Sequence, residues 1–451
     1  MTLTTLKANN CQFAVKSGGH ASFAGASNID GAVTIDLRNL NELVVSECKT
    51  EVSVGAGMVW SSVYLELDAR NLSVVGGRSG AIGVGGLTLG GGISFFSGRY
   101  GWACDNVNNY EVILFKSTFV FSSLTPIIQV VFADGSIHDV NEKSFPDLYF
   151  ALRGGGNNFG IVTRFDLASF EQGKMLGGQT LYTADNMPAL NTALYNFNIN
   201  HYKDPYGAVI VAYVYVPAEG IFLASVDLEY GKPEPNPAIL ANFTAIPSIE
   251  TTARITNLTD LTIELNSTQP SGSRETFWAF MVHNDVQILT DIQALFASQI
   301  PAISNASGLL PALVMQPIST AITSHFTSNG GNALGITAAD GALLRMCLLL
   351  LFPQQSNIVC FIVINISIAW TDIADDDRIM EFAANFISSG VALAKSRNLA
   401  HRYIYQNYAA APQDVFTGYG PINKARLQAI HQKYDPTNVF TKLQPGYFKS
   451  N

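Results

Sequence analysis

The glycine-rich stretch at residues 76–101 constrains this chain more than any other feature. It reads GGRSGAIGVGGLTLGGGISFFSGRYG. Glycine loses conformational entropy on folding, so such a run is favoured only where the backbone needs unusual torsion angles or must let another group approach closely. Consecutive amides without side chains form a concave donor surface that suits a pyrophosphate. Apolar residues alternate with the glycines, which favours a buried ligand cradle over a solvated surface loop.

Length and composition narrow the class of protein. A chain of 451 residues predicts two or three domains. Charged residues make up only 14%, the net charge is -9 and no run of Lys or Arg occurs, so nucleic acid is not expected as a partner. No CxxC pair is present, so no structural metal site is expected. The odd number of cysteines leaves at least one thiol without an internal partner; they are Cys11, Cys48, Cys104, Cys347 and Cys360.

Sequons for N-glycosylation indicate a secreted glycoprotein. They occur at Asn71, Asn242, Asn257, Asn266, Asn305 and Asn365. The last of them lies in an apolar run, where a sugar could not be placed. Residues 1–7 lack the basic start and apolar core of a signal peptide, so the signal for secretion is not expected within this chain.

The pattern of strands and helices changes near residue 177. Before it, short strands and glycine turns predominate, with a hairpin at 44–54, a helix at 60–67 and a second hairpin around the Asp-Gly turn at 134–135. After it, longer strands and helices indicate a separate antiparallel α+β domain. The strands are expected at 180–182, 208–215 and 223–230, and the helices at 185–198 and 286–300. An amphipathic helix is predicted at 422–434, near the carboxy terminus.

Two strongly apolar stretches, residues 113–129 and 345–363, interrupt this pattern. The first splits a predicted hairpin arm and the second splits a predicted strand. Lys116 and Pro126 make the first unsuitable as a membrane span, and Pro353 does the same for the second. They are either insertions that the fold does not need, such as unspliced introns, or ordinary buried strands.

His20 is the first candidate for chemistry. It ends the turn KSGGH at residues 16–20, so its imidazole can approach a ligand closely. A neutral imidazole nitrogen is a nucleophile near neutral pH, although a lone histidine is more often a structural hydrogen-bonding group.

The order of the motifs resembles the FAD-linked oxidases of the vanillyl-alcohol oxidase/para-cresol methylhydroxylase superfamily. The chain is most similar to the berberine-bridge-enzyme-like oxidoreductases in their fungal form. The motifs extend along nearly the whole chain, and their shared order is more specific than any one of them. They are KSGGH at 16–20, DLRNL at 36–40, VGAG at 54–57, GVGG at 83–86, GGG at 90–92, ADGS at 133–136, LRGGGNNFGIVT at 152–163, YIYQNY at 403–408 and YDPTNVF at 434–440.

This resemblance implies FAD bound in an extended pose, with His20 joined covalently to the flavin. Many relatives have a second link through a cysteine just before the GVGG motif. Ser79 occupies that position here, and Cys104 lies too far along the chain to replace it by alignment, so a single link is expected. The cofactor-binding residues that the resemblance implies are Ser17, Gly18, Gly19, His20, Ser79, Gly83, Gly85, Gly86, Gly90, Gly91, Gly92, Gly101, Gly160, Val162 and Asn407.

The resemblance also implies a catalytic base near the carboxy terminus. A hydride would pass from a substrate carbon to flavin N5, and a base would take the accompanying proton. Tyr405 and Tyr408 are the candidates, with ordinary aromatic packing as the equally weighted alternative. A phenol needs a neighbouring positive charge for this role, and Arg402 is the nearest in sequence. Ser22 replaces the tyrosine of the plant enzymes, which argues against plant alkaloid substrates. O2 is expected to reoxidise the flavin.

Together these observations predict an α+β fold. It comprises an FAD-binding PCMH-type domain of two lobes at 1–170, an antiparallel-sheet substrate domain with flanking helices at 177–400, and a berberine-bridge-like segment at 401–451 that returns to the FAD domain. Relatives carry more residues before the His20 turn, so we expect either that the chain is truncated at its amino end or that part of the cofactor site is missing.

The expected function is that of a secreted, monomeric FAD-dependent oxidoreductase. Its substrate would be an alcohol, a sugar or a secondary metabolite. The alternative is a degenerate, non-catalytic protein with a flavin-binding fold. An NAD(P) enzyme is disfavoured, because no strand–GxGxxG–helix unit occurs.

Overall fold

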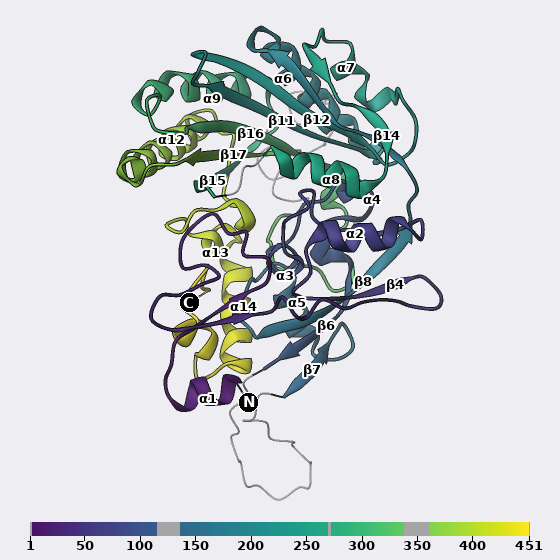
Figure 1. Ribbon diagram of the computed structural model, residues 1–451, viewed down its shortest axis with the longest axis vertical. Coiled ribbons are helices and arrows are strands. Elements are labelled where there is room, and N and C mark those ends of the chain that lie inside the picture. Colours follow the sequence, from purple (N-terminus) through teal and green to yellow (C-terminus); the bar gives the residue numbers. More distant parts are fainter. Residues whose placement is uncertain (1, 115–135, 269–271, 338–359, 451) are drawn as a thin grey trace, which may run out of the picture.

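A computed structural model describes residues 2–114, 136–268, 272–337 and 360–450 of the chain. Two lobes are stacked along the long axis of the molecule, each built on its own sheet (Figure 1). Each lobe also has its own hydrophobic core. No helix of these described residues combines the length and the apolar character needed to cross a membrane.

The first lobe contains a parallel pair of strands and a six-stranded antiparallel sheet. In the pair, Phe13 of β1 lies opposite Val33 of β2. The six-stranded sheet has the order β3-β4-β8-β6-β7, with β5 on β8. The strands are β1 (Phe13–Lys16), β2 (Val33–Asp36), β3 (Leu43–Val45), β4 (Glu51–Gly55), β5 (Leu72–Val74), β6 (Val107–Ile113), β7 (Ile137–Val140) and β8 (Ile161–Glu171). The helices are α1 (Thr2–Ala8), α2 (Trp60–Asp68), α3 (Val84–Leu89), α4 (Ser97–Tyr100) and α5 (Pro146–Leu152).

The second lobe is a ten-stranded sheet in which every pairing is antiparallel. Its main order is β13-β10-β12-β11-β16-β17-β15-β18. The strands are β9 (Met175–Gly177), β10 (Gln179–Thr183), β11 (Gly207–Val216), β12 (Ile221–Tyr230), β13 (Glu250–Thr251), β14 (Arg254–Thr256), β15 (Arg274–His283), β16 (Leu310–Ile318), β17 (Phe361–Trp370) and β18 (Ala400–His401).

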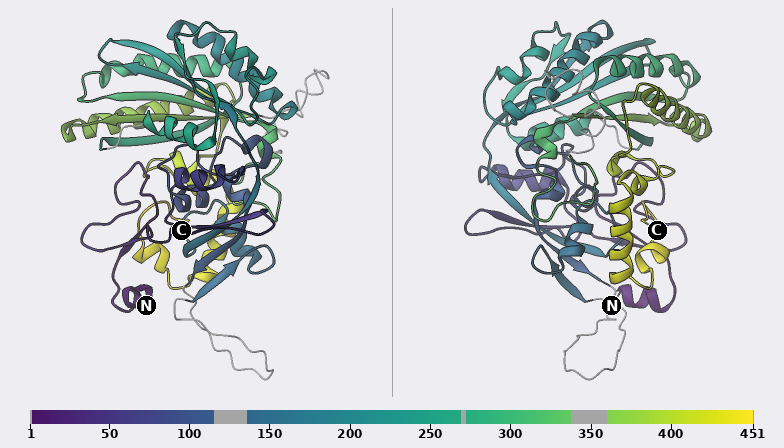
Figure 2. Two further views of the ribbon diagram at one scale, coloured as in Figure 1. Left: turned by 45° about the vertical axis from the view of Figure 1, so that its right-hand side comes forward. Right: turned by 180° about the vertical axis from the view of Figure 1, so that it is seen from behind.

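The longer helices of this lobe cover the outer face of the sheet (Figure 2). They are α6 (Met187–Asn200), α9 (Val286–Gln299) and α12 (Asp376–Ser396). Alternate strand residues such as Val211 and Leu313 pack against them in the second core. Because successive side chains point to opposite faces, the residues between them face the first lobe. The shorter helix α8 (Leu258–Ser267) lies on that inner side and contacts α2.

Both apolar stretches lie mostly outside the described residues, but their described ends belong to strands. Ile113 is the last residue of β6 and pairs with Ile137 of β7. Phe361 to Val363 begin β17, where they are buried and pair with both β15 and β16. The boundaries predicted from sequence therefore need correction, since Ile113 and Phe361 to Val363 are integral to the two sheets.

The carboxy-terminal segment leaves the second lobe and packs on the first. After β18 it forms α13 (Val415–Gly418) and α14 (Pro421–Tyr434). Tyr434 and Phe440 are buried in the core of the first lobe. Lys433 forms an ion pair with Asp147 of α5 at 2.6 Å. This return path brings the YIYQNY motif to the boundary between the lobes.

Candidate active site

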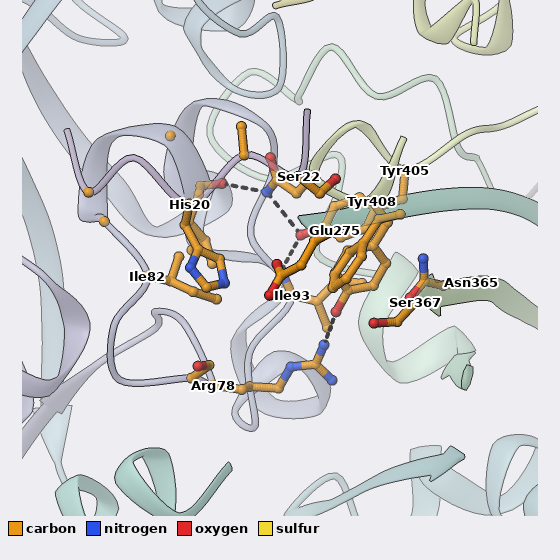
Figure 3. A pocket seen from close by; sticks show the side chains of 18 of the residues that line it. His20, Ser22, Arg78, Ile82, Ile93, Glu275, Asn365, Ser367, Tyr405 and Tyr408 are labelled. Atoms are coloured by element: carbon orange, nitrogen blue, oxygen red, sulfur yellow. Dashed lines mark hydrogen bonds between the residues drawn. The ribbon is translucent and has the colours of Figure 1, made fainter. Parts of the chain in front are cut away.

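A cavity of about 520 Å³ lies between the inner face of the large sheet and the first lobe. Most residues predicted from sequence to form the site line it together (Figure 3). These are Ser17, Gly18, Gly19, His20, Ser79, Gly83, Gly85, Gly86, Gly160, Val162, Tyr405, Asn407 and Tyr408. Four segments far apart in sequence therefore meet at one place.

The other four predicted glycines lie behind the cavity wall and do not line it. A Cβ on Gly90 would lie 2.0 Å from Oδ1 of Asn407. Gly91, Gly92 and Gly101 have positive φ angles, where an L-residue is strained, and each packs closely against a side chain. At all four positions a side chain would come too close to a neighbouring group.

The two glycine turns that line the cavity pack directly against each other. A Cβ on Gly18 would lie 2.5 Å from the amide nitrogen of Gly83. Ser17 fixes the contact, because its hydroxyl donates to the carbonyl of Ala56 at 2.6 Å and accepts from the amide of Gly85 at 3.2 Å. Gly18 and Gly19 line the cavity, and their amides make no hydrogen bond to other described residues. This donor-lined cradle fits the diphosphate of a dinucleotide such as FAD.

His20 lies at the cavity wall and its imidazole is directed inward (Figure 3). Although part of His20 remains exposed, loss of hydration beside the surrounding protein lowers the pKa of its imidazole. The neutral form therefore dominates at neutral pH, as a nucleophilic nitrogen requires.

None of the described cysteines lines the cavity. Ser79 does, and its hydroxyl donates to Oδ1 of Asn266 at 3.1 Å. Cys104 is buried beside Asp105, and burial raises the pKa of its thiol.

Tyr405 and Asn407 connect the carboxy-terminal segment to the glycine-rich stretch. The phenol oxygen of Tyr405 accepts from the amide of Ile93 at 3.0 Å and from Nδ2 of Asn407 at 3.1 Å. The same amide group of Asn407 donates to the carbonyl of Leu87 at 3.0 Å. Tyr405 is 2% exposed, and burial, followed by the neighbouring Tyr408, raises its pKa.

Tyr408 has very different partners. Its phenol oxygen accepts from Nη2 of Arg78 at 2.6 Å and from Nε2 of Gln316 at 3.0 Å. Arg78 Nη2 also donates to Oε1 of Gln316 at 2.6 Å, which closes a three-residue network at the cavity wall. Figure 3 shows the contact between Arg78 and Tyr408. Arg402, the cation expected from sequence, instead donates to the carbonyl of Gly335 at 2.6 Å and does not line the cavity.

Sequence reasoning missed both partners of Tyr408. Arg78 stands inside the glycine-rich stretch, directly before Ser79, and its position as the one basic residue between Gly76 and Gly92 was a usable signal. Gln316 lies in β16 without any motif around it. Two further polar residues that line the cavity, Glu275 and Asp227, were missed as well.

Asp227 lies on β12 beneath the network. Burial raises the pKa of its carboxyl to about 7. The positive charge of Arg78 opposes this rise, and the negative charge of Glu264 adds to it.

Asn365 of β17 also lines the cavity and is 2% exposed. The sequence-based expectation that its sequon cannot carry a sugar agrees with this burial.

Comparison with known proteins identifies two matching family models. One is described as FAD binding domain and matches residues 2–121, and the other is described as Berberine and berberine like and matches residues 405–445. The chain is also similar to the FAD-dependent monooxygenase tpcD of Cochliobolus heterostrophus. They share 35% identity over 464 residues, which cover 100% of this chain and 82% of that protein. The bifunctional solanapyrone synthase of Alternaria solani is 30% identical over 441 residues, covering 97% of this chain and 76% of that protein.

Solved structures with the same fold include several oxidases. The 6-hydroxy-D-nicotine oxidase of Arthrobacter nicotinovorans superposes with a TM-score of 0.74 at 19% identity, covering 100% of this chain and 89% of that chain. The xylooligosaccharide oxidase of Myceliophthora thermophila C1, in complex with xylobiose, gives a TM-score of 0.70 at 18% identity, with the same coverages of 100% and 89%. At these identities the likeness extends to the fold alone.

Proposed function

This chain belongs to the FAD-dependent oxidoreductases that combine an FAD-binding domain with a berberine-like carboxy-terminal domain, and from that premise we propose that it oxidises a small molecule in the cavity between its lobes. FAD, when bound, supplies the acceptor for a hydride taken from the substrate. The residues of the cavity must then hold the cofactor, orient the substrate and accept the proton that leaves with the hydride.

Tyr408 is the proposed base, and its network with Arg78 and Gln316 is the observation that carries the proposal. A positive charge and a second donor, both within 3.0 Å, stabilise negative charge on the phenol oxygen. That oxygen lies at the cavity wall, so a substrate hydroxyl or amine can donate its proton there. Tyr405 is proposed to hold the glycine-rich stretch in place. Its oxygen accepts one hydrogen bond from the amide of Ile93, directly after the GGG motif at 90–92, and one from Asn407.

His20 is proposed as the single covalent tether of the flavin. Support comes from its inward direction, from its neutral imidazole and from Ser79 in place of the second linking residue. O2 is proposed as the final electron acceptor, which would yield hydrogen peroxide. A secreted, monomeric enzyme of secondary metabolism is the proposed biological setting; solanapyrone synthase and tpcD, both fungal proteins, support it only as relatives.

Acid precipitation of the purified protein tests the covalent tether. We expect a protein that absorbs near 450 nm and gives a yellow pellet, and a His20→Ala variant whose pellet is colourless. His138→Ala is the matched control, because His138 lies on β7 and does not line the cavity. A yellow pellet from His20→Ala would contradict the tether. A wild-type protein without any flavin absorbance would contradict the oxidoreductase and favour the non-catalytic alternative, which no described feature favours at present.

A further inference from the structure

We propose that the substrate has a rigid, apolar body with one hydrogen-bonding group besides the group that is oxidised, and that it lies on an aliphatic strip of the large sheet with that further group held by Glu275. This inference rests on the proposed function, because it names the substrate class of the same cavity. The proposal excludes carbohydrates as substrates, although the fold alone would also allow them.

The aliphatic strip is formed by three neighbouring strands. Cross-strand pairs place Ala212 of β11 opposite Val314 of β16, and Val214 opposite both Ala312 of β16 and Leu223 of β12. These residues line the cavity and are only partly buried. Their alternate neighbours, such as Val211, Leu313 and Met315, are completely buried beneath the outer helices. The strip is therefore an apolar surface that the helices of the second lobe do not cover.

An aliphatic surface of this kind selects against sugars. An antiparallel sheet that faces water on one side normally carries polar residues there, so an uncovered aliphatic strip indicates that the part of the occupant above it is apolar. A carbohydrate has hydroxyl groups around its ring, and each would lose hydrogen bonds to water against Ala, Val and Leu side chains. A hydrocarbon body has no hydrogen bonds to water to lose, and its transfer from water to an apolar surface is favourable in free energy.

Glu275 is, with Asp227, one of the two acidic residues of the large sheet among the described residues that line the cavity. It lies on β15 opposite Ala369 of β17, faces the cavity and is half-buried (Figure 3). Its carboxylate makes no hydrogen bond or ion pair with any residue that the structure describes. Burial raises its pKa, with no partner to oppose the effect. A buried carboxyl without a partner is costly, so a ligand hydroxyl or amine in contact with it would be held specifically.

Spectral titration of the flavin-loaded protein tests the proposal without turnover. The probes are decahydro-1-naphthol, decalin, which has the same body without the hydroxyl, and cellobiose. We expect decahydro-1-naphthol to perturb the flavin absorbance and to bind about 10-fold more tightly than decalin. Cellobiose should have no effect, even at concentrations about 100-fold higher.

Variants assign the two parts of the site. Glu275→Leu should reduce the preference for decahydro-1-naphthol over decalin to about one, whereas Glu219→Leu, on the exposed turn after β11, should leave it unchanged. Val214→Asp should weaken binding of both bicyclic probes by at least about 10-fold, and Val44→Asp, at a site on β3 that is 51% exposed, should not.

The outcomes separate this inference from the proposed function. Flavin-loaded protein that binds cellobiose as well as decahydro-1-naphthol, or that responds to neither bicyclic probe, would overturn the substrate class while leaving the oxidoreductase intact. An unchanged probe preference in Glu275→Leu would overturn the role of Glu275. Protein that carries no flavin would overturn the proposed function, and the inference with it.

Discussion

The guanidinium group of Arg78 donates to the phenol oxygen of Tyr408 at 2.6 Å, although 330 positions separate the two residues in sequence. Arg78 comes from the glycine-rich stretch of the first lobe, and Tyr408 from the segment that returns from the second. Gln316 of the large sheet completes the network. The proposed base is therefore assembled only when both lobes and the carboxy-terminal segment are in place, which ties catalysis to the correct docking of the lobes.

Removal of the Arg78 charge should slow the reaction without removing the flavin. In Arg78→Met the phenol oxygen of Tyr408 loses its positively charged donor, so kcat should fall by about 10²- to 10³-fold. Stopped-flow reduction of the bound flavin measures this step directly. Arg402→Met is the control, since that residue donates to a backbone carbonyl away from the cavity. Equal losses in the two variants would show that the Arg78–Tyr408 contact has no special role.

The two tyrosines should respond differently to loss of their hydroxyl groups. Tyr408→Phe removes the proposed base, so kcat should fall by about 10²- to 10⁴-fold with the melting temperature nearly unchanged. Tyr405→Phe leaves the Ile93 amide without its acceptor, which should lower the free energy of unfolding by about 1 to 3 kcal/mol and disturb flavin loading. Flavin reduction rates and thermal unfolding, measured together on both variants, distinguish these effects. A larger rate loss in Tyr405→Phe would reverse the assignment.

The contact between the two glycine turns should not tolerate a methyl group. The φ angle of Gly83 is -72°, which alanine can adopt, so backbone torsion is not the obstacle. A Cβ there would instead lie 2.3 Å from the amide nitrogen of Gly18. Gly83→Ala should therefore lower flavin content and reduce the free energy of unfolding by about 1 to 3 kcal/mol. Gly173→Ala has open space around its Cβ and serves as the control. Full flavin loading of Gly83→Ala would contradict the predicted clash.

Protonation of His201 should destabilise the fold at mildly acidic pH. Burial lowers its pKa from 6.5 to about 4. Its Nδ1 contacts the hydroxyl of Ser319 at 2.8 Å, and its buried Nε2 has no partner among the described residues. A lowered folded-state pKa means that the unfolded chain binds the proton more readily, so stability is lost as the pH falls below about 6.5 and the loss is complete near pH 4.

The size of this effect corresponds to roughly 3 kcal/mol across the interval. Melting temperatures of wild type and His201→Gln between pH 7.5 and 4 measure it. The variant should show a shallower decline, because glutamine has no proton to gain. Parallel curves for the two proteins would mean that other groups account for the acid sensitivity.

Glycosylation should distinguish exposed from buried sequons. Asn242 is exposed on α7 (Ala241–Thr244), whereas Asn365 is 2% exposed in the middle of β17. If the protein is secreted as proposed, Asn242 should carry a glycan and Asn365 should not. Peptide mass spectrometry after enzymatic deglycosylation, which converts each glycosylated Asn to Asp, measures both sites in one sample. An unmodified Asn242 in secreted protein would contradict the prediction.

Local sequence determined the cofactor cradle and the course of the chain. Gly18, Gly83 and Gly85 are recognisable without a structure, because tight turns and close backbone approaches demand specific residue types. The same is true of His20, which ends the KSGGH turn, and of the YIYQNY motif. Regular apolar spacing likewise predicted the helix at 60–67, which the structure confirms as α2, ending at Asp68. Residue type alone did not separate the glycines that line the cavity from Gly90, whose neighbour Asn407 is distant in sequence.

Only the tertiary structure decided which residues meet across the cavity. β11 and β16 are apolar on both faces, so alternation along the strand could not show that Val211 faces helices while Ala212 and Val214 face the cavity. The partners of Tyr408 come from strands and turns that only the docking of two lobes brings together. The sequence by itself therefore determined the family, the cofactor and the turns that are proposed to hold it. The charge beside the proposed base and the apolar floor of the cavity depend on long-range packing, which no local pattern encodes.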